Sequence, residues 1–372
     1  MLFYRGLTVG GTERQIVALA EGLAARGHAV RIVTFYGDNP LGAGLAGRGV
    51  ELVSLDKSGR WDLFGFIGRF LGQVRKWRPD AIYSFLPVSN IVALSAKLAR
   101  PRLPVVWGVR TAFLDLSRHD WLTRHSYTLE ARAAWLADTV IANSHAALAY
   151  LKQRGFANRR IKVVLNGIDV DRFHSDPEAR DRLRAEWGVG HGSKLVGTVA
   201  RLDPEKGIEL FLEAAARMIA NDPSVVFIAV GGGSAAYRET LVALAGKRGL
   251  GGKIIWAGPR SDMPAVYAAL DLLVLASPNE GTSNVVLEAL ACGLPVVATD
   301  VGDNKRAIGD CGQVVPLGEA GALAEAIARQ LDRVARDGAT LAAQCRRRIL
   351  DDYTLDTMVA ATEAILRELA TA

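Results

Sequence analysis

Short hydrophobic runs recur along the first 172 residues of the chain, and longer stretches separate them. The runs are rich in Val and Ile and rarely alternate with polar residues, which is typical of strands buried on both faces of a parallel sheet. We expect these strands at residues 29–35, 50–55, 81–86, 105–110, 139–143 and 161–165. The stretches between them predict helices at residues 12–25, 63–77, 89–98 and 121–137. This alternation indicates βα units and a doubly wound α/β domain.

The same pattern returns later in the chain. We expect strands there at residues 195–200, 225–230, 253–257, 272–276, 296–299 and 313–315. Residues 172–192 are charged and interrupted by Pro177 and glycines, so we place the linker around them. Residues 353–369 predict an amphipathic last helix. A length of 372 residues suits two domains, in residues 1–172 and 173–352.

Composition and charge narrow the function classes. The three cysteines show no C-x-x-C spacing, which argues against disulfides and zinc and predicts a reducing, cytoplasmic setting. No apolar run approaches the roughly 18 residues of a membrane span, and the start has no signal-peptide layout. The net charge is +6, with a basic first half and a slightly acidic second half. The first half is therefore expected to meet an anionic partner.

Two carboxylates stand out between residues 273 and 302, where two buried strands flank a loop and a helix. The loop and helix start comprise Glu280, Gly281, Thr282, Ser283 and Asn284. Free N–H groups at such a helix start face the C-terminal edge of the sheet, where doubly wound folds bind ligands. Glu288 follows two turns later on an apolar surface and needs a partner, which ligand hydroxyl groups could supply. The alternative is a helix-start charge and one solvated Glu.

A pair of cations follows the first strand of the second half. Arg201 ends that strand and Lys206 stands at the next helix start, an arrangement that suits a diphosphate group. The alternative is a solvated turn in which Asp203 and Glu205 neutralise both cations. The next strand ends in Gly231 and Gly232, where the backbone either approaches a nucleotide or makes a loose turn.

Glycines also follow the first strand of the chain. Gly10 and Gly11 open a helix, so the backbone there could approach a phosphate group, although a plain tight turn is an equal alternative. Neither half opens with G-x-G-x-x-G, and the chain lacks a P-loop, which counts against a dehydrogenase and a P-loop NTPase. Asp169 and Asp171 have the D-x-D form of some metal sites, but we expect Asp169 to cap a turn.

Residues 57–79 mix basic and aromatic side chains. This composition is typical of a helix that lies on an anionic membrane surface. The alternative is a helix that covers the sheet and has a basic outer face. Binding to nucleic acid fits less well, because no nucleic-acid module is recognisable.

Four fragments, in this order, resemble one family. They are Gly10-Gly11, the NGID sequence from Asn166, the RLDPEKG sequence from Arg201, and EGTSNVVLEALACGLPVVATDVG from Glu280. Together they resemble the retaining GT-B glycosyltransferases of family 4, over almost the whole chain. The resemblance implies two Rossmann-like domains with a cleft between them, and a last helix, here within residues 353–372, that returns to the first domain.

The resemblance also implies roles for single residues. Glu280 would contact the donor sugar, Glu288 the ribose, and Arg201 and Lys206 the departing diphosphate. The implied reaction retains the anomeric configuration and needs no metal or other cofactor, because the leaving phosphate itself acts as base. The partners would be a nucleoside-diphosphate sugar and a glycan or lipid-linked acceptor of cell-surface polysaccharide or glycolipid synthesis. We expect a cytoplasmic protein at the inner face of the cytoplasmic membrane.

The chain departs from this family at Arg110. Many members have a histidine at the end of this strand, beside the donor sugar, so that role cannot be transferred. Arg110 could clamp a phosphate or an acidic acceptor, or form an ion pair with Asp115 or Asp120. No role follows for His119 or His125. Two rival functions stay open at this point: a nucleotide-sugar epimerase on the same fold, and a non-catalytic subunit.

Overall fold

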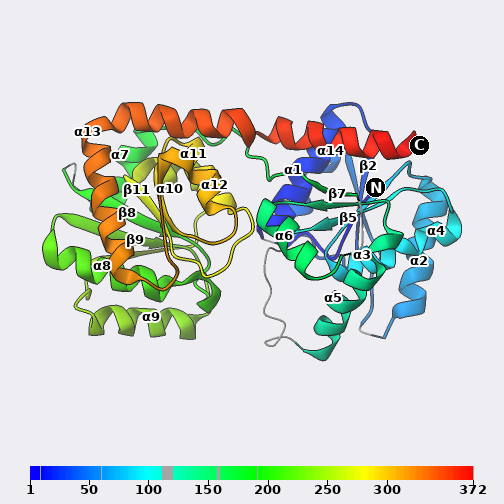
Figure 1. Cartoon of the computed structure of the whole chain (residues 1–372), viewed down its shortest axis with the longest axis horizontal. Coiled ribbons are helices and arrows are strands. Elements are labelled where there is room, and N and C mark those ends of the chain that lie inside the picture. The colour runs from blue at the N-terminus through cyan, green and yellow to red at the C-terminus, as the bar shows by residue number, and fades with distance from the viewer. Residues whose placement is uncertain (9, 60, 111–119, 157–159, 191, 372) are drawn as a thin grey trace. The chain divides into compact units, whose positions relative to one another are not determined.

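The computed structural model (Figure 1) describes all residues of the chain except 9, 60, 111–119, 157–159, 191 and 372. The chain divides into two units. The first comprises Met1–Gly167 together with Leu355–Ala372, and the second comprises Ile168–Thr354. Each unit has its own parallel sheet, as the hydrophobic pattern predicted, and the two-domain α/β fold is confirmed.

The sheet of the first unit has seven parallel strands in the order β3-β2-β1-β4-β5-β6-β7. The strands are β1 (Leu2–Tyr4), β2 (Val30–Thr34), β3 (Val50–Ser54), β4 (Ile82–Phe85), β5 (Val105–Val109), β6 (Thr139–Ala142) and β7 (Ile161–Val163). Successive side chains of a strand point to opposite faces, so Phe3 lies in one core while Leu2 and Tyr4 lie in the other. Because helices cover both faces, most residues of the strands are apolar.

Helices pack on both faces of this first sheet. The face of Leu2 carries α1 (Gly11–Ala25) and α14 (Leu355–Ala370). The face of Phe3 carries α2 (Leu63–Trp77), α3 (Pro87–Leu94), α4 (Ala96–Ala99), α5 (Trp121–Ala133) and α6 (His145–Gln153). Gly22 allows α14 to approach α1, because a Cβ atom there would lie 2.4 Å from Val359 Cγ2.

The sheet of the second unit has six parallel strands in the order β10-β9-β8-β11-β12-β13. They are β8 (Lys194–Val199), β9 (Val225–Val230), β10 (Ile254–Gly258), β11 (Leu272–Leu275), β12 (Val296–Thr299) and β13 (Gly312–Val315). The strand order reverses between β8 and β11. Such a switch point, at the carboxyl ends of the strands, is where open α/β sheets bind ligands.

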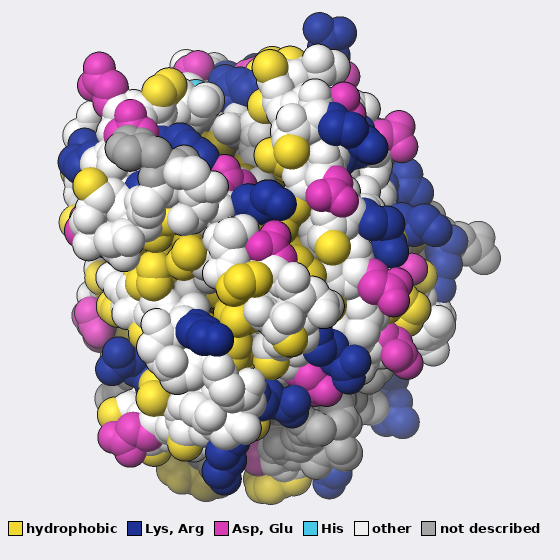
Figure 2. Space-filling model, turned by 90° about the vertical axis from the view of Figure 1, so that its left-hand side faces the viewer, with side chains coloured by type: hydrophobic (Ala, Val, Ile, Leu, Met, Phe, Trp, Pro, Cys, Tyr) yellow, Lys and Arg dark blue, Asp and Glu magenta, His cyan; other side chains and the backbone are white. Residues whose placement is uncertain are grey.

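The helices of the second unit are α7 (Pro177–Glu186), α8 (Ile208–Asn221), α9 (Ala235–Lys247), α10 (Met263–Ala269), α11 (Asn284–Ala291), α12 (Asn304–Ile308) and α13 (Ala320–Asp352). The helical geometry of α13 is interrupted at Asp337. Figure 2 views the side on which Figure 1 draws this unit, and basic and acidic side chains are interspersed there. The slight acidic excess of the second half is therefore not gathered on this face.

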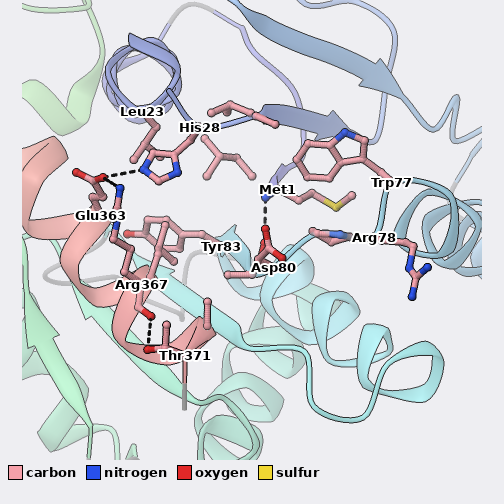
Figure 3. A pocket seen from close by; sticks show the side chains of 17 residues that line it. Met1, Leu23, His28, Trp77, Arg78, Asp80, Tyr83, Glu363, Arg367 and Thr371 are labelled. Carbon is pink, nitrogen blue, oxygen red and sulfur yellow. Dashed lines mark hydrogen bonds and ion pairs between the residues drawn. The ribbon is translucent and has the colours of Figure 1, made fainter. Parts of the chain in front are cut away.

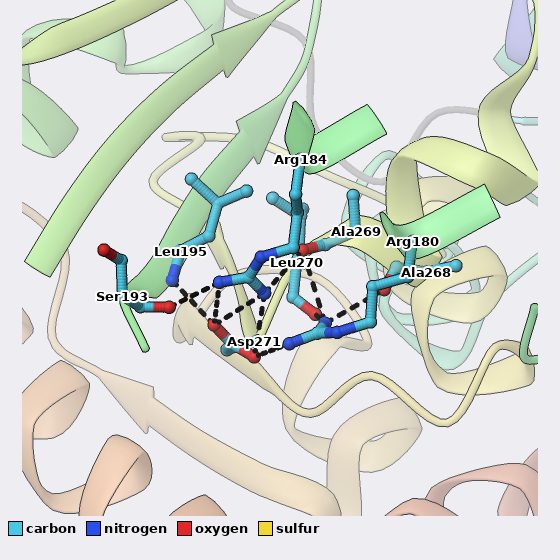
Figure 4. Close-up of polar contacts among 8 residues, drawn as sticks. All are labelled: Arg180, Arg184, Ser193, Leu195, Ala268, Ala269, Leu270 and Asp271. Atoms are coloured by element: carbon cyan, nitrogen blue, oxygen red, sulfur yellow. Dashed lines mark hydrogen bonds and ion pairs between the residues drawn. The ribbon is translucent and has the colours of Figure 1, made fainter. Parts of the chain in front are cut away.

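Helix α7 lies within the segment that we expected to be a linker. Pro177 begins the helix, and the Asp176 side chain caps it by accepting from the Ala179 N–H. Arg180 and Arg184 then reach Asp271 at the start of β11, and they also donate to backbone carbonyls of residues 268–270 and 193 (Figure 4). Since these contacts belong to the second unit, the segment is a packed part of it.

Two other helices differ from the expectation. The helix expected at residues 89–98 starts earlier and is divided at Ser95, between α3 and α4. The helix expected at residues 121–137 ends at Ala133 and continues as a short 3-10 turn over Ala134–Leu136. These differences shift boundaries and leave the order of strands and helices unchanged.

Candidate functional site

An ion pair occupies the switch point of the second sheet. Lys206 ends the 3-10 turn Pro204–Lys206 that follows β8, and Glu280 stands in the loop that follows β11. Lys206 Nζ lies 2.9 Å from Glu280 Oε1. Gly207 makes this approach possible: its φ is 63°, and a Cβ atom there would lie 2.1 Å from the Ala276 carbonyl oxygen. Residues 74 positions apart thus meet at the place where a ligand is expected.

The loop that carries Glu280 is braced from β12. Gly302 lies against it, because a Cβ atom there would be 2.2 Å from the Glu280 carbonyl oxygen. The Asp303 N–H donates to the Gly281 carbonyl at 2.8 Å. Thr282 and Ser283 are buried, Ser283 is the N-cap residue of α11, and Asn284 is its first residue. The loop is therefore held in one shape at the positive end of the helix dipole.

Glu288 is buried about one turn into α11, on the apolar surface that the sequence pattern indicated. It is 7 % exposed, and the Tyr267 hydroxyl of α10 donates to its Oε2 atom at 2.6 Å. Burial, together with the nearby Glu288 carboxylate, raises the pKa of Cys292 to about 12. A protein hydroxyl therefore already supplies part of the hydrogen bonding that a buried carboxylate needs. The sequence did not indicate Tyr267, whose partner lies 21 positions away.

Arg201 and Lys206 have different surroundings. The Arg201 side chain is 68 % exposed and lies 3.7 Å from an oxygen of Asp203, which is a weak surface contact. Asp203 also accepts from the Glu205 N–H. Neutralisation within the turn, one of our two expectations, therefore applies in part to Arg201, whereas Lys206 pairs across the switch point.

The glycines after β9 allow close backbone contacts within the chain. A Cβ atom on Gly231 would lie 1.7 Å from the Ala200 carbonyl oxygen, and one on Gly233 would lie 2.2 Å from the Leu202 carbonyl oxygen. Leu202 donates its N–H to the Gly232 carbonyl at 2.8 Å. The close approach that the glycines permit is to the segment after β8, which carries Arg201. A donor contact at Gly231 and Gly232 stays a prediction.

In the first unit, Gly10 is the N-cap residue of α1 and Gly11 its first residue. The carboxylate of Glu13 reaches back over this helix start, where Thr8 and Tyr4 donate to its Oε1 atom at 3.3 and 3.2 Å. Burial, with Glu13 as the second cause, raises the pKa of Tyr4. The sequence reasoning missed Glu13, although acidic residues are favoured in the first turn of a helix. An incoming phosphate group would therefore meet an anion here.

Arg110 follows β5 directly, and its Nη2 atom donates to Asn166 Oδ1 at 3.0 Å. Tyr83 and Tyr4 also face the guanidinium group, and burial lowers the pKa of Arg110, which stays protonated. Asp115 and His119 lie outside the described residues. Asp120 caps α5, and His125 is exposed on that helix with its Nδ1 atom 2.6 Å from the Trp121 carbonyl.

The NGID sequence spans the end of the first unit at Gly167 and the start of the second unit at Ile168. The Gln15 amide of α1 both donates to and accepts from the backbone of Gly167, at 2.9 and 3.0 Å. Asp169 accepts from the N–H groups of Asp171 and Arg172, which confirms the predicted turn cap. Across the described part of the chain, no group of three His, Cys, Asp or Glu side chains could hold a metal ion. Independence of a metal stays a prediction.

Residues 57–79 include α2, which shows the sheet-covering alternative, while contact with a membrane surface stays a prediction. Phe66, Phe70 and Val74 are buried against the sheet, so the helix does cover it. Trp61 and Phe64, at its start, are 89 % and 88 % exposed. The aromatic side chains that a membrane surface would contact are therefore at one end of the helix. None of the helices in the described parts has the length and hydrophobicity needed to cross a membrane.

A cavity of about 410 Å³ lies at the opposite, amino edge of the first sheet. Figure 3 shows Tyr83 pointing into it, with Trp77 on one side and the His28–Glu363 ion pair of 2.7 Å on the other. His28 thereby joins the segment before β2 to α14, which is a structural role. None of the predicted site residues lines this cavity.

Comparison with protein families gives two matches. Residues 9–172 match the family described as Glycosyltransferase Family 4, and residues 193–333 match the family described as Glycosyl transferases group 1. The two matches are consecutive and together span most of the chain. They cover every predicted site residue of both units.

Curated relatives match over part of their length. A D-inositol 3-phosphate glycosyltransferase of Mycolicibacterium smegmatis is 36 % identical over 205 residues, which are 53 % of this chain and 46 % of that protein. The lipopolysaccharide core biosynthesis mannosyltransferase LpsB of Rhizobium meliloti is 34 % identical over 168 residues, 44 % of this chain and 46 % of that protein. The chain thus matches somewhat less than half the length of these relatives.

Solved structures resemble the whole chain. The Anabaena protein HepE, in complex with UDP, superposes with a TM-score of 0.85 at 24 % identity, covering 99 % of both chains. WaaG, described as a glycosyltransferase of lipopolysaccharide biosynthesis, superposes with a TM-score of 0.75 at 21 % identity, covering 98 % of this chain and 99 % of WaaG. At these identities the likeness establishes the shared fold.

Proposed function

Because the chain belongs to family 4 of the GT-B glycosyltransferases, we propose that it transfers a sugar from a nucleoside-diphosphate sugar to a glycan or lipid-linked acceptor. The Lys206–Glu280 pair at the switch point of the second sheet carries this proposal. The pair joins a cation to the carboxylate of Glu280 at 2.9 Å, which supports contact with a donor that carries both a diphosphate and a hexose. Buried Glu288, about one turn into α11, would bind the ribose.

The donor is tested first among uridine-diphosphate sugars. Solved structures of HepE, which share the fold, contain UDP or UDP-glucose. The LpsB relative is named a mannosyltransferase, so GDP-mannose belongs in the same screen. Ligand binding to the folded state raises the melting temperature, and a thermal-shift screen of these donors therefore identifies the base and the sugar together.

The proposed chemistry is electrostatic and retaining. Arg201 and Lys206 would stabilise the negative charge that develops on the departing diphosphate, and the α11 start adds its dipole. The acceptor would attack on the face that the diphosphate leaves, so we assign no nucleophile to the protein. No metal takes part in this scheme. An NMR determination of the anomeric configuration of the product decides between retention and inversion.

A lipid-linked acceptor would bring the chain to a membrane. The exposed Trp61 and Phe64 at the start of α2, together with basic Arg75 and Lys76 of that helix, support contact of the first unit with an anionic bilayer. The proposed place of action is the inner face of the cytoplasmic membrane, in the synthesis of cell-surface polysaccharide or glycolipid.

The deciding experiment measures release of UDP from UDP-glucose with and without candidate acceptors. The proposal requires acceptor-dependent release that Glu280→Gln abolishes. An epimerised sugar nucleotide in the absence of acceptor would favour the epimerase, and binding of donors without any turnover would favour a non-catalytic subunit.

A further inference from the structure

The backbone of Leu86 is strained. Its φ of 70° and ψ of 156° lie in a region that L-residues with side chains rarely adopt. Leu86 follows β4 at the carboxyl edge of the first sheet, beside β1, where the strand order reverses. Pro87 begins α3, and Val88 is 49 % exposed on this turn. A strained turn thus occupies the position that corresponds to the ion pair of the second sheet.

A buried hydrogen-bond network holds this turn. The Leu86 N–H donates to the Gly108 carbonyl at 3.2 Å, and the Asn90 N–H donates to the Leu86 carbonyl at 2.9 Å. The Asn90 side chain accepts from Ser84 Oγ at 2.8 Å and donates to the same Gly108 carbonyl at 3.4 Å. Asn90 therefore joins both strand ends to the turn, and its amide has one possible orientation.

The network ends at a buried carboxylate on another helix. Asn90 Nδ2 donates to Glu130 Oε1 of α5 at 2.7 Å, and both residues are at most 1 % exposed. The other carboxylate oxygen, Oε2, has no hydrogen-bond partner among the described residues and lies 3.7 Å from Arg154 Nη1, which also has none. Among the groups that influence Glu130, Arg154 is the charged one, and burial raises the pKa of Glu130 to about 7.

A contribution to the stability of the fold does not by itself explain this arrangement. A buried carboxylate with one unsatisfied oxygen costs free energy, and apolar side chains of similar size often replace such groups without loss. What the carboxylate does provide is a charged acceptor that fixes Asn90, because hydrogen bonds to charged groups are stronger than neutral ones. The strained Leu86 backbone needs such support, since strain persists only where the surroundings enforce it.

We propose that Glu130 is a positioning residue for the proposed glycosyl transfer, holding the strained Leu86 turn at the switch point of the first sheet through Asn90. The turn presents Leu86 and Val88 on the side of the chain that is expected to receive the acceptor. This proposal rests on the proposed function for its consequence in catalysis, and on the network alone for its structural part.

Hydrogen exchange tests the structural part independently of any substrate. In Glu130→Leu, the peptides that cover residues 84–95 should exchange at least tenfold faster than in the wild type, while peptides of the second unit keep their rates. Glu130→Gln should restore slow exchange, because its amide oxygen still accepts from Asn90. Unchanged exchange at residues 84–95 in a folded Glu130→Leu variant would overturn the proposal.

Turnover tests the catalytic part, with release of UDP from UDP-glucose, or from whichever donor the screen identifies, as the readout. In the wild type, kcat should rise as the pH rises through about 7, because the deprotonated carboxylate holds Asn90 more tightly. The Glu130→Gln variant should lack this step and Glu130→Leu should lose at least tenfold in kcat, with the KM for the donor unchanged in both. A wild-type pH profile in Glu130→Gln would contradict the positioning role.

The two proposals fail in different ways. If no donor is turned over by the wild type, the proposed function is wrong and the exchange data still decide the role of Glu130. If the wild type is active and Glu130→Leu keeps its kcat, the positioning role is wrong and the proposed function stands. Arg78→Gly is the matched control: it relaxes another residue with positive φ, of 52°, at the end of α2, and should change neither readout.

Discussion

The six strands of the second sheet have the same order as the first six strands of the first sheet. The residues at the two switch points nevertheless differ in kind. In the second sheet, the charged side chains of Lys206 and Glu280 meet there, and Gly207 and Gly302 allow close backbone contacts beside them. In the first sheet, the corresponding strand ends carry a strained turn that buried side-chain hydrogen bonds hold. The comparison indicates a charged ligand such as a diphosphate for the second unit. In the first unit it indicates shape and rigidity.

Removing a cation from the second switch point should have the largest effect. Lys206→Ala should lower kcat/KM by an amount equivalent to about 2–4 kcal/mol of transition-state stabilisation, and Arg201→Ala should act in the same direction. Steady-state kinetics with the identified donor measure this. Lys194, which lies 3.7 Å from Asp222, offers the control Lys194→Ala, expected to be silent. Normal kinetics in Lys206→Ala would remove the cation from the site.

Substitutions of the two glutamates should impair different steps, transfer in one case and binding of UDP in the other. Glu280→Gln should cripple transfer and leave UDP binding unchanged or tighter, because Lys206 loses its partner. Glu288→Ala should weaken binding of UDP itself, and Tyr267→Phe should do the same to a smaller extent, because it removes the hydroxyl that holds Glu288. Isothermal titration with UDP, beside transfer assays, separates the two. The reverse pattern would mean that the roles are exchanged.

Arg110 tests whether the first switch point also needs a charge. Arg110→Lys should lose most of the activity, because a point charge cannot replace the planar guanidinium group that contacts Asn166. The exposed Arg102 provides the control, Arg102→Lys. Near-normal turnover in Arg110→Lys with unchanged donor affinity would place Arg110 outside the site and would leave the first switch point without a required charge.

Glu130 should make the first unit sensitive to pH. Its pKa is raised from 4.5 to about 7 by burial, so the folded state binds the proton more tightly than the unfolded state. Its contribution to the free energy of unfolding is therefore favourable at low pH and is lost as the pH rises from about 4.5 to 7, by roughly 3 kcal/mol at most. Denaturant unfolding should show Glu130→Gln gaining stability relative to the wild type over this interval. A pH-independent difference would contradict the assignment.

The smallest effect is expected at the surface of the first unit. Co-sedimentation with anionic vesicles should fall as salt is added, and Trp61→Ser with Phe64→Ser should weaken it further, by a few kcal/mol at most. Val242→Ser, at an exposed hydrophobic residue of the second unit, is the control. Absence of binding at low salt would favour an acceptor in solution.

The strands could be predicted from the sequence because both faces of each sheet are covered. Val225–Val230 is apolar throughout and Val296–Thr299 is apolar up to its last residue, and their expected bounds agree with the structure. Helix α7 was missed for the opposite reason. Beside Ala179 and Leu183 it buries Arg184, which pairs with Asp271, so part of its packing is polar and leaves little amphipathic signal.

The site residues, like the helices, could be predicted only where a local sequence pattern indicates them. Glu280, Glu288, Arg201 and Lys206 could be proposed as site residues because they stand in local motifs, and their roles in binding stay a prediction. The contacts that complete the site join residues far apart, such as Tyr267 with Glu288, and no local spacing indicates them. Asn90 and Glu130, 40 positions apart, look like an ordinary helix residue and an ordinary surface charge until the fold buries both.

The discontinuous make-up of the first unit has a consequence for synthesis on the ribosome. The face of α1 that carries Ile16, Leu19 and Leu23 is covered by α14, which follows the entire second unit in sequence. Domains generally fold as they emerge, so the second unit is expected to reach its native state while this apolar face still waits for its cover. Translation therefore leaves a hydrophobic surface open for the time needed to make residues 168–354, a natural period for chaperone binding.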